Sequence, residues 1–221
     1  MEDEKIIIVD VSSWDDAPTI NRQVNFWKMK EAGARGAIIR FGHDDFTDHS
    51  AMLNYELALS AGLWVGAYWW LGWKTNHIDQ MKRFAAMLRF TAGLDFPPII
   101  DFESPKPLAA RWKPSDKLRE ALEYLEGRIA TEGNTLPPMI YTSPGFWGSY
   151  GTKDIAWARY PLWLAHYRVA KPRIPAPWTD YAIWQYDDRG DGLKYGQQSK
   201  QADMNLYNPA DCFGLLKQEA E

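Results

Sequence analysis

The chain of 221 residues contains a single cysteine, Cys212, so it cannot form an internal disulfide. Its stability must therefore come from a packed core. The sequence also lacks an apolar run long enough to cross a bilayer. The first ten residues, MEDEKIIIVD, lack the basic start and long apolar stretch of a signal peptide. We therefore expect that a protein of this kind, if it works outside a cell, is released by another route or has lost a leader.

An excess of basic residues is absent as well. The chain has 25 Lys and Arg against 29 Asp and Glu, giving a formal net charge of −4. Because nucleic acids and anionic membranes bind basic surfaces, we expect neither as a partner. The sequence also lacks a GxGxxG motif, a phosphate-binding glycine loop, internal repeats and a low-complexity linker. Nothing therefore calls for a second domain, and we expect one domain over residues 1–221. The sequence does not fix the oligomeric state; we expect a monomer, with no cofactor and no metal.

Short apolar segments rich in β-branched and aromatic residues recur along the chain. Their near-continuous apolar character is typical of strands buried on both faces of a parallel sheet. Seven are well marked and the last is weaker. They are Lys5–Val11, Gly36–Phe41, Leu63–Trp70, Pro97–Glu103, Pro137–Thr142, Pro161–Tyr167, Tyr181–Tyr186 and Ala202–Asn208.

Helical spacing of apolar residues fills the early gaps between these strands. It predicts helices over Ile20–Ala32, over Ala51–Ala61, from Asn76 to Gly93, and after Ser115 as an N-cap. Alternating strands and helices favour an α/β fold, and eight strands favour a single irregular, TIM-like (β/α)₈ barrel. Strands after Tyr141 follow at roughly twenty-residue intervals, so the C-terminal half should have short or missing helices. A doubly wound open sheet is the alternative.

The segment PPIIDFES, residues 97–104, contains the most informative pair of acids. In an extended chain Asp101 and Glu103 point to one face and Phe102 to the other, with the acidic Cα atoms roughly 6.5 Å apart. Like charge and partial burial raise the pKa of at least one member of such a pair. The pair therefore indicates acid/base chemistry or cation binding. Alternatively, the strand ends at Ile100 and the acids lie in a solvated turn.

Further polar and aromatic residues lie at the ends of the other predicted strands. In a parallel barrel these ends form one rim, which carries the active site. Acids at the rim, surrounded by flat aromatic side chains, are typical of a site that grips a sugar and cleaves its glycosidic bond. The predicted acids are Asp10, Asp101, Glu103 and Asp203, and the predicted substrate contacts are Arg40, Tyr68, Trp70, Tyr141, Trp163, Trp184 and Gln185. Trp69, Trp73 and Trp147 are further candidates for stacking on sugars.

Several ordered motifs resemble those of glycoside hydrolase family 25, a family of lysozymes (N-acetylmuramidases) that includes phage endolysins. They are DVSSW at Asp10–Trp14, GAYWW, IIDFE at Ile99–Glu103, IYTSPGFW at Ile140–Trp147, PLWLAHY, and IWQYDDRG followed by ADMNLYN. The resemblance implies a modified barrel and hydrolysis of the β-1,4 bond between N-acetylmuramic acid and N-acetylglucosamine in the glycan strands of bacterial peptidoglycan. One departure is that Trp69-Trp70 follows Tyr68 where many members have His-Phe.

The resemblance also implies roles for the four acids. Glu103 matches the general acid, Asp101 the assisting carboxylate, and Asp10 and Asp203 the two further acids. We expect aromatic burial and neighbouring charges to raise the pKa of Glu103 and hydrogen bonds to keep Asp101 ionised. The spacing leaves the stereochemical outcome open, although the resemblance favours retention through the N-acetyl group of the substrate.

Other functions and local interpretations stay open from the sequence. Asp10 could cap the Ser12–Ser13 turn, and Arg40 is expected to pair with an acid of the rim. The four acids could instead bind Mg²⁺ or Ca²⁺ in a metal-dependent hydrolase. A non-catalytic glycan-binding barrel is the third possibility.

Overall fold

The computed structural model describes residues 5–15, 23–103, 113–130, 136–210 and 215. Cys212, the first part of the helix expected over Ile20–Ala32, and part of the loop after Glu103 lie outside these ranges. None of the helices in the described part is long and apolar enough to cross a membrane.

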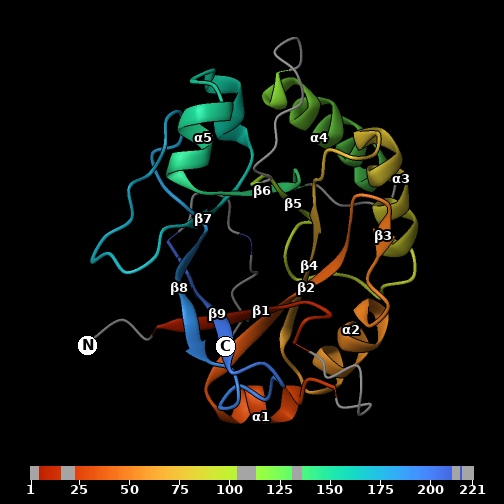
Figure 1. Cartoon of the computed structure of the whole chain (residues 1–221), viewed down its shortest axis with the longest axis vertical. Helices are drawn as coiled ribbons and strands as arrows, with labels where there is room; N and C mark the ends of the chain where they lie inside the picture. The colour runs from red at the N-terminus through yellow and green to blue at the C-terminus, as the bar shows by residue number, and fades with distance from the viewer. Residues whose placement is uncertain (1–4, 16–22, 104–112, 131–135, 211–214, 216–221) are drawn as a thin grey trace.

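Eight strands close into a barrel (Figure 1). They follow the order β1-β9-β8-β7-β6-β5-β4-β2, and β1 also pairs with β2, which closes the ring and rules out the open doubly wound sheet. A short ninth strand, β3 (Phe46–Thr47), pairs with the end of β2. The barrel strands are β1 (Ile6–Val11), β2 (Ala34–His43), β4 (Trp64–Trp70), β5 (Ile99–Asp101), β6 (Met139–Thr142), β7 (Leu162–Ala165), β8 (Ile183–Asp191) and β9 (Gln201–Tyr207).

The barrel is irregular, as predicted, and part of its irregularity is the last strand, which runs against the others. β9 pairs antiparallel with both β8 and β1. The connection between β8 and β9 spans only residues 192–200, which suits a hairpin and is too short for a crossover. Because of this reversal, Asp203 near the start of β9 lies opposite Asp10 on β1, at the same rim as the C-terminal ends of the parallel strands.

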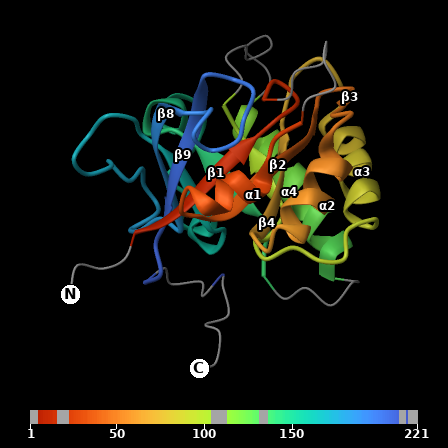
Figure 2. The same ribbon diagram turned by 90° about the horizontal axis from the view of Figure 1, so that it is seen from below.

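The helices lie outside the barrel, and the longer ones lie on the β2 and β4 side (Figure 2). The helices are α1 (Phe26–Glu31), α2 (Ala51–Ser60), α3 (His77–Leu88), α4 (Pro114–Ala130), α5 (Pro144–Tyr150) and the 3₁₀ helix η1 (Ile155–Arg159). Past β6 the helices are short, as the strand spacing predicted.

Two helix starts differ from the sequence prediction. The helix predicted over Ile20–Ala32 begins only at Phe26, where the Asn25 side chain accepts a hydrogen bond from the Lys28 backbone N–H at 3.0 Å. Ser115 lies inside α4 rather than capping it, because the helix starts at Pro114. Proline suits a first helical position, since its missing N–H would have no helical partner there.

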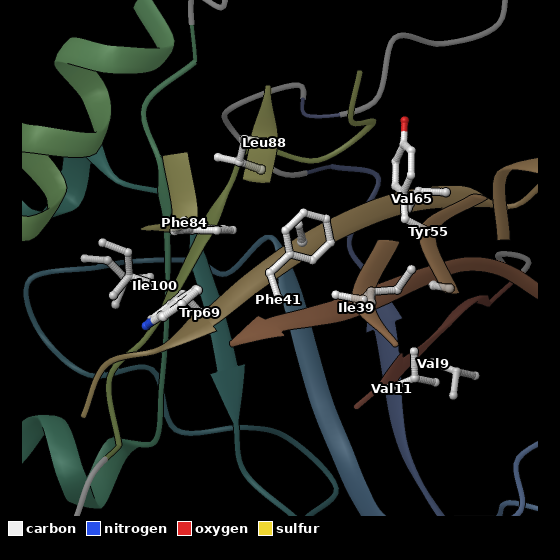
Figure 3. Close-up of a cluster of buried hydrophobic side chains, with 14 of the residues drawn as sticks. Val9, Val11, Ile39, Phe41, Tyr55, Val65, Trp69, Phe84, Leu88 and Ile100 are labelled. Carbon is white, nitrogen blue, oxygen red and sulfur yellow. The ribbon is translucent and has the colours of Figure 1, made fainter. Parts of the chain in front are cut away.

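Strand alternation divides the apolar core into two layers. Ile8 and Ile38 belong to a cluster inside the barrel, whereas their neighbours Val9 and Ile39 face the helices. Figure 3 shows the outer layer, in which Trp69 from β4 meets Phe84 from α3. Two residues further along β1 and β2, the inner face carries Asp10 and Arg40 instead of apolar side chains. The polar residues of the rim therefore lie next to the apolar core inside the barrel.

Candidate active site

A pocket at this rim brings all four predicted acids together. Its cavity volume is roughly 70 Å³, and it is polar. Four of the seven predicted substrate contacts share it. Its lining consists of Asp10, Tyr68, Asp101, Glu103, Tyr141, Trp163, Gln185 and Asp203. These residues come from β1 and from every barrel strand between β4 and β9, so the pocket exists only when the barrel is closed.

The Asp101–Glu103 segment keeps the predicted alternation. Asp101 ends β5 and is buried, Glu103 faces the same pocket, and the ring of Phe102 packs on the outer side against Phe146 and Trp147. The Phe102 N–H donates to the Tyr141 carbonyl at 2.9 Å, which holds the chain extended past the strand end. The alternative of a strand ending at Ile100 with a solvated acidic turn is therefore wrong.

Asp10 is held by amides from the far end of the sequence. Its Oδ2 accepts hydrogen bonds from Gln185 Nε2 at 2.9 Å and from Asn205 Nδ2 at 2.8 Å. Asn205, fully buried, also accepts a hydrogen bond from the Trp163 indole N–H at 2.8 Å. The turn after β1 uses other acids, because the Ser12 and Ser13 N–H groups donate to Asp15 and Asp48. Asp10 therefore does not act as the cap of that turn.

Two tyrosines meet on the opposite side of Gln185. The hydroxyl groups of Tyr141 and Tyr167 each donate to Gln185 Oε1 at 2.7 Å. With both its oxygen and its nitrogen engaged, Gln185 has a fixed orientation toward Asp10. Neither Tyr167 nor Asn205 was assigned to the site from the sequence. Each lies on or beside a strand segment already expected at the rim. That position was the feature of the sequence that could have assigned them to the site.

The pKa of Glu103 is raised above that of an ordinary glutamate, so its carboxyl group keeps its proton to higher pH. It remains exposed on one side at the mouth of the pocket. Burial of its carboxyl group among the pocket walls raises its pKa, and hydrogen bonds from Tyr141 and Trp70 act in the opposite direction. The direction agrees with the sequence prediction. The main cause is burial, where the sequence had also suggested the charges of Asp101 and Asp10.

Asp101 differs from its prediction. Burial raises its pKa well above the usual value, the charges of Glu103 and Asp10 add to this, and Arg40 opposes them. Its Oδ1 atom is buried and has no hydrogen-bond partner among the residues that the structure describes. The hydrogen bonds expected to keep Asp101 ionised are therefore missing at this oxygen, and a substrate group could supply one.

Asp10 and Asp203 also hold protons more tightly than free aspartate. Burial and the charge of Asp203 raise the pKa of Asp10. Burial and the charges of Asp15 and Asp188 raise the pKa of Asp203 to about 6. Four carboxyl groups with raised pKa values thus share one rim, which is typical of a site that uses carboxylic acids for chemistry.

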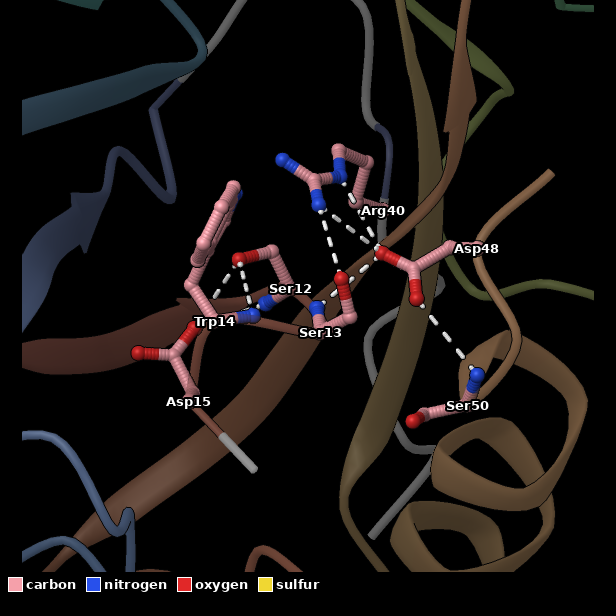
Figure 4. A network of polar contacts seen from close by, with 7 residues as sticks. All are labelled: Ser12, Ser13, Trp14, Asp15, Arg40, Asp48 and Ser50. Atoms are coloured by element: carbon pink, nitrogen blue, oxygen red, sulfur yellow. Dashed lines mark hydrogen bonds and ion pairs between the residues drawn. The ribbon is translucent and has the colours of Figure 1, made fainter. Parts of the chain in front are cut away.

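Three predicted contacts lie outside the pocket lining. Arg40 pairs with Asp48 at 3.1 Å, an acid that the sequence had not placed at the rim (Figure 4). Trp70 lies beside the pocket, hydrogen-bonded to Glu103. The Trp184 indole N–H donates to the His166 carbonyl at 2.9 Å.

The other tryptophans suggested as stacking surfaces are mainly core residues. Trp69 and Trp147 are buried in the outer core, and Trp163, although it lines the pocket, is 1% exposed. Trp73 is half-buried and packs its ring against Phe102. Among the described aromatic residues, the exposed ones are others, namely Trp14 (79%), Trp27 (49%), Phe46 (41%) and Phe90 (79%).

A larger cavity lies elsewhere and does not fit the chemistry. It has a volume of roughly 350 Å³ between α5 and the loop around residues 173–176, and includes Lys153 and Arg173 in its lining. Among the described residues that line it, none is acidic. We therefore place the candidate active site in the smaller acidic pocket.

Metal binding by the four acids has no geometric support. In the described ranges, no group of three or more His, Cys, Asp or Glu side chains is arranged to hold a metal ion. Asp10 instead directs one oxygen at two amide groups.

Comparisons with known proteins bear on the family and the fold of the chain. A family model described as glycosyl hydrolases family 25 matches residues 9–193. Lysozyme M1 of Streptomyces globisporus is 24% identical over 206 residues, covering 90% of this chain and 67% of that protein.

Solved structures show the same fold. A bacterial lysozyme from Streptomyces coelicolor superposes with a TM-score of 0.75 at 22% identity, covering 97% of both chains. The catalytic domain of endolysin ply40 from bacteriophage P40 of Listeria monocytogenes gives a TM-score of 0.72 at 18% identity, covering 94% of this chain and 95% of that one.

Proposed function

The chain belongs to glycosyl hydrolases family 25, as a lysozyme-type glycoside hydrolase, and from that premise we propose that it is an N-acetylmuramidase. The proposed reaction is hydrolysis of the β-1,4 bond between N-acetylmuramic acid and N-acetylglucosamine in bacterial peptidoglycan. The observation that carries the proposal is the pocket in which Asp10, Asp101 and Asp203 surround Glu103. A polar pocket lined by carboxylic acids with raised pKa values suits the cleavage of a glycosidic bond.

Glu103 is the proposed general acid. Its raised pKa keeps a larger fraction protonated at working pH, and its exposed side gives it access to the leaving oxygen of a bound glycan. Trp70 hydrogen-bonds to the charged form, and the single hydroxyl proton of Tyr141, directed at Gln185 Oε1 in the free pocket, can turn to Glu103 as it ionises. They therefore stabilise the carboxylate that remains after the proton has moved to the sugar.

Asp101 is the proposed assisting carboxylate. Its unpartnered Oδ1 lies in the same pocket and would accept a hydrogen bond from the acetamido N–H of the substrate. That bond stabilises the ionised form of Asp101, which the free pocket disfavours. The carbonyl oxygen of the oriented acetamido group would then attack the anomeric carbon while the glycosidic bond breaks and Glu103 protonates the leaving oxygen. Water would open the resulting oxazolinium ion with a second inversion and lose its proton to Glu103, so the configuration is retained.

The proposal is tested by the release of reducing sugars from purified peptidoglycan. Glu103→Gln removes the transferable proton with little change in size, so activity should fall by about a hundredfold or more. Glu123→Gln on the exposed face of α4 is the matched control and should retain full activity. Equal release by wild type and Glu103→Gln would remove the assignment of the acid. No release by the folded wild type would favour a glycan-binding barrel.

A further inference from the structure

We propose that Arg40 and Trp14 form a recognition site for a carboxylate-bearing sugar at the edge of the catalytic pocket. The ligand chemistry is a pyranose with a carboxylate on its side chain, as in a muramyl residue. The inference rests on the proposed function, because it assigns the group by which a muramidase would tell a muramyl residue from N-acetylglucosamine.

Arg40 is held in place by a buried acid, Asp48. Its Nε donates to Asp48 Oδ2 at 3.1 Å, and its Nη2 lies 3.1 Å from the same oxygen and from Ser13 Oγ. The Asp48 side chain is 1% exposed, and Asp48 also accepts hydrogen bonds from the backbone N–H groups of Ser13 and Ser50. A guanidinium group held in this way has already lost its side-chain freedom, so binding an anion costs little further entropy.

The remaining nitrogen of Arg40 is available to a ligand. Among the residues that the structure describes, Nη1 has no hydrogen-bond partner. Figure 4 shows this nitrogen pointing away from Asp48, toward the side on which the Trp14 ring stands. The Asp48 side chain is 1% exposed and the Arg40 side chain is 12% exposed, so the guanidinium group is the more accessible end of the ion pair. An anion on the outer side therefore meets two guanidinium donors without approaching Asp48.

Trp14 provides a flat apolar surface on the side of Arg40 toward which Nη1 points (Figure 4). It follows Ser13, the residue that hydrogen-bonds to Arg40, and its side chain is 79% exposed. The turn that displays it is rigid, since the Trp14 N–H donates to Ser12 Oγ at 3.2 Å and the Ser12 N–H donates to Asp15 at 2.7 Å. An exposed indole in a fixed turn suits stacking against the apolar face of a pyranose.

The site adjoins the acid pocket. Arg40 is paired in register with Tyr68 on β4 and lies on β2 two residues beyond Ile38, the partner of Asp10 on β1. The charge of Arg40 lowers the pKa of Asp101 on β5, against the larger effect of burial. A sugar stacked on Trp14 with its carboxylate on Arg40 would therefore belong to the same glycan strand whose bond lies at Glu103.

The decisive experiment compares peptide-free glycan strands carrying free lactyl carboxylates with the same strands converted to methylamides. We expect wild type to cleave the free-acid strands with a kcat/KM about tenfold higher, the value of one charge-assisted hydrogen bond. Arg40→Gln combined with Asp48→Asn removes both charges without leaving a buried ion, and should bring the ratio close to one. Equal efficiency of wild type on both substrates, or an unchanged ratio in the double variant, would overturn the role of Arg40.

The carboxylate could come from the lactyl group of the sugar or from the stem peptide attached to it. Intact peptide-bearing strands, in which the peptide occupies the lactyl carboxyl group, distinguish these two sources. Cleavage as poor as that of the methylamide assigns recognition to the lactyl carboxylate. Cleavage as efficient as that of the free acid assigns it to a carboxylate of the stem peptide. Failure of wild type to cleave any of the three substrates would count against the muramidase proposal itself.

Trp14→Ala tests the stacking surface without threatening the fold, because the side chain is largely exposed. It should raise KM about fivefold on both the free-acid and the methylamide strands, leaving kcat and the ratio between substrates unchanged. Phe90→Ala is the matched control, since Phe90 is equally exposed at 79% and follows α3. It should change neither constant, and an unchanged KM in Trp14→Ala would overturn the role of Trp14.

Discussion

Asp10 and Asp203 lie directly opposite each other on the antiparallel strands β1 and β9, although they come from the two ends of the sequence. Burial and the charge of Asp203 raise the pKa of Asp10, whereas burial and the charges of Asp15 and Asp188 raise the pKa of Asp203 from 3.8 to about 6. Such a pair lowers stability when both members are charged. It is the kind of arrangement that a protein keeps for the chemistry of a site.

A first prediction concerns stability and pH. The folded protein binds the Asp203 proton more tightly than the unfolded chain, so this group stabilises the fold at low pH, and the contribution is lost as pH rises through about 6. Asp203→Asn mimics the protonated form. Its free energy of unfolding should exceed that of wild type by about 1 to 3 kcal/mol at pH 8, with little difference near pH 3.5. Urea unfolding at both pH values measures this, and a pH-independent difference would contradict it.

The pH dependence of activity follows from Glu103. Only the protonated form can donate to the leaving oxygen, so kcat/KM should fall as pH rises through the pKa of Glu103 in the free enzyme. Because burial raises this pKa, the fall should begin above the range of an ordinary glutamate. A profile on a soluble muramyl oligosaccharide tests the expectation. A rate that stays constant into strongly alkaline solution would be incompatible with this acid.

Asn205 is predicted to matter through Asp10. It links the Trp163 indole to the Asp10 carboxylate, and Asn205→Ala leaves both buried groups without this partner. We expect unfolding to become easier by about 1 to 3 kcal/mol and kcat to fall by up to about a hundredfold in the folded enzyme.

Asn208→Ala provides the control for that experiment. Asn208 hydrogen-bonds to Asp180 and the Tyr181 carbonyl, outside the pocket lining, so its loss should affect stability and leave kcat unchanged. Similar kcat values for the Asn205 and Asn208 variants would show that the amide beside Asp10 has no part in catalysis.

Gly72 is predicted to be intolerant of any side chain. A Cβ atom there would overlap the carboxyl group of Asp44, which is buried, has a positive φ of 45° and accepts the Lys74 N–H at 2.9 Å. Gly72→Ala should lower the free energy of unfolding by about 1 to 3 kcal/mol. Gly127→Ala inside α4, where a Cβ meets no atom within 4 Å, should instead stabilise by about 0.5 to 1 kcal/mol. Thermal unfolding of both variants separates steric overlap from a general effect of replacing glycine.

A chelator distinguishes the remaining alternative chemistry. Acid/base cleavage by Glu103 requires no ion, so prolonged treatment with EDTA should leave the rate unchanged. Loss of activity that added Mg²⁺ or Ca²⁺ restores would instead support the metal-dependent hydrolase.

The sequence by itself determined what depends on neighbours along the chain. Alternation in the segment from Pro97 to Ser104 was enough to place Asp101 and Glu103 on one face and Phe102 on the other. Eight apolar segments were enough to predict the barrel, because a buried strand can be recognised from the apolar residues of its own segment. The shortness of the late helices followed from strand spacing alone.

Only the tertiary structure decided what depends on distant partners. The direction of β9, the amides that hold Asp10, the pairing of Arg40 with Asp48 and the missing partner of Asp101 all require contacts between separate strands. Burial of a carboxyl group, and with it the direction of its pKa shift, is set by the closed barrel rather than by adjacent residues. For the same reason, local pattern could not show that Trp69 and Trp147 are core residues while Trp14 stands in solvent.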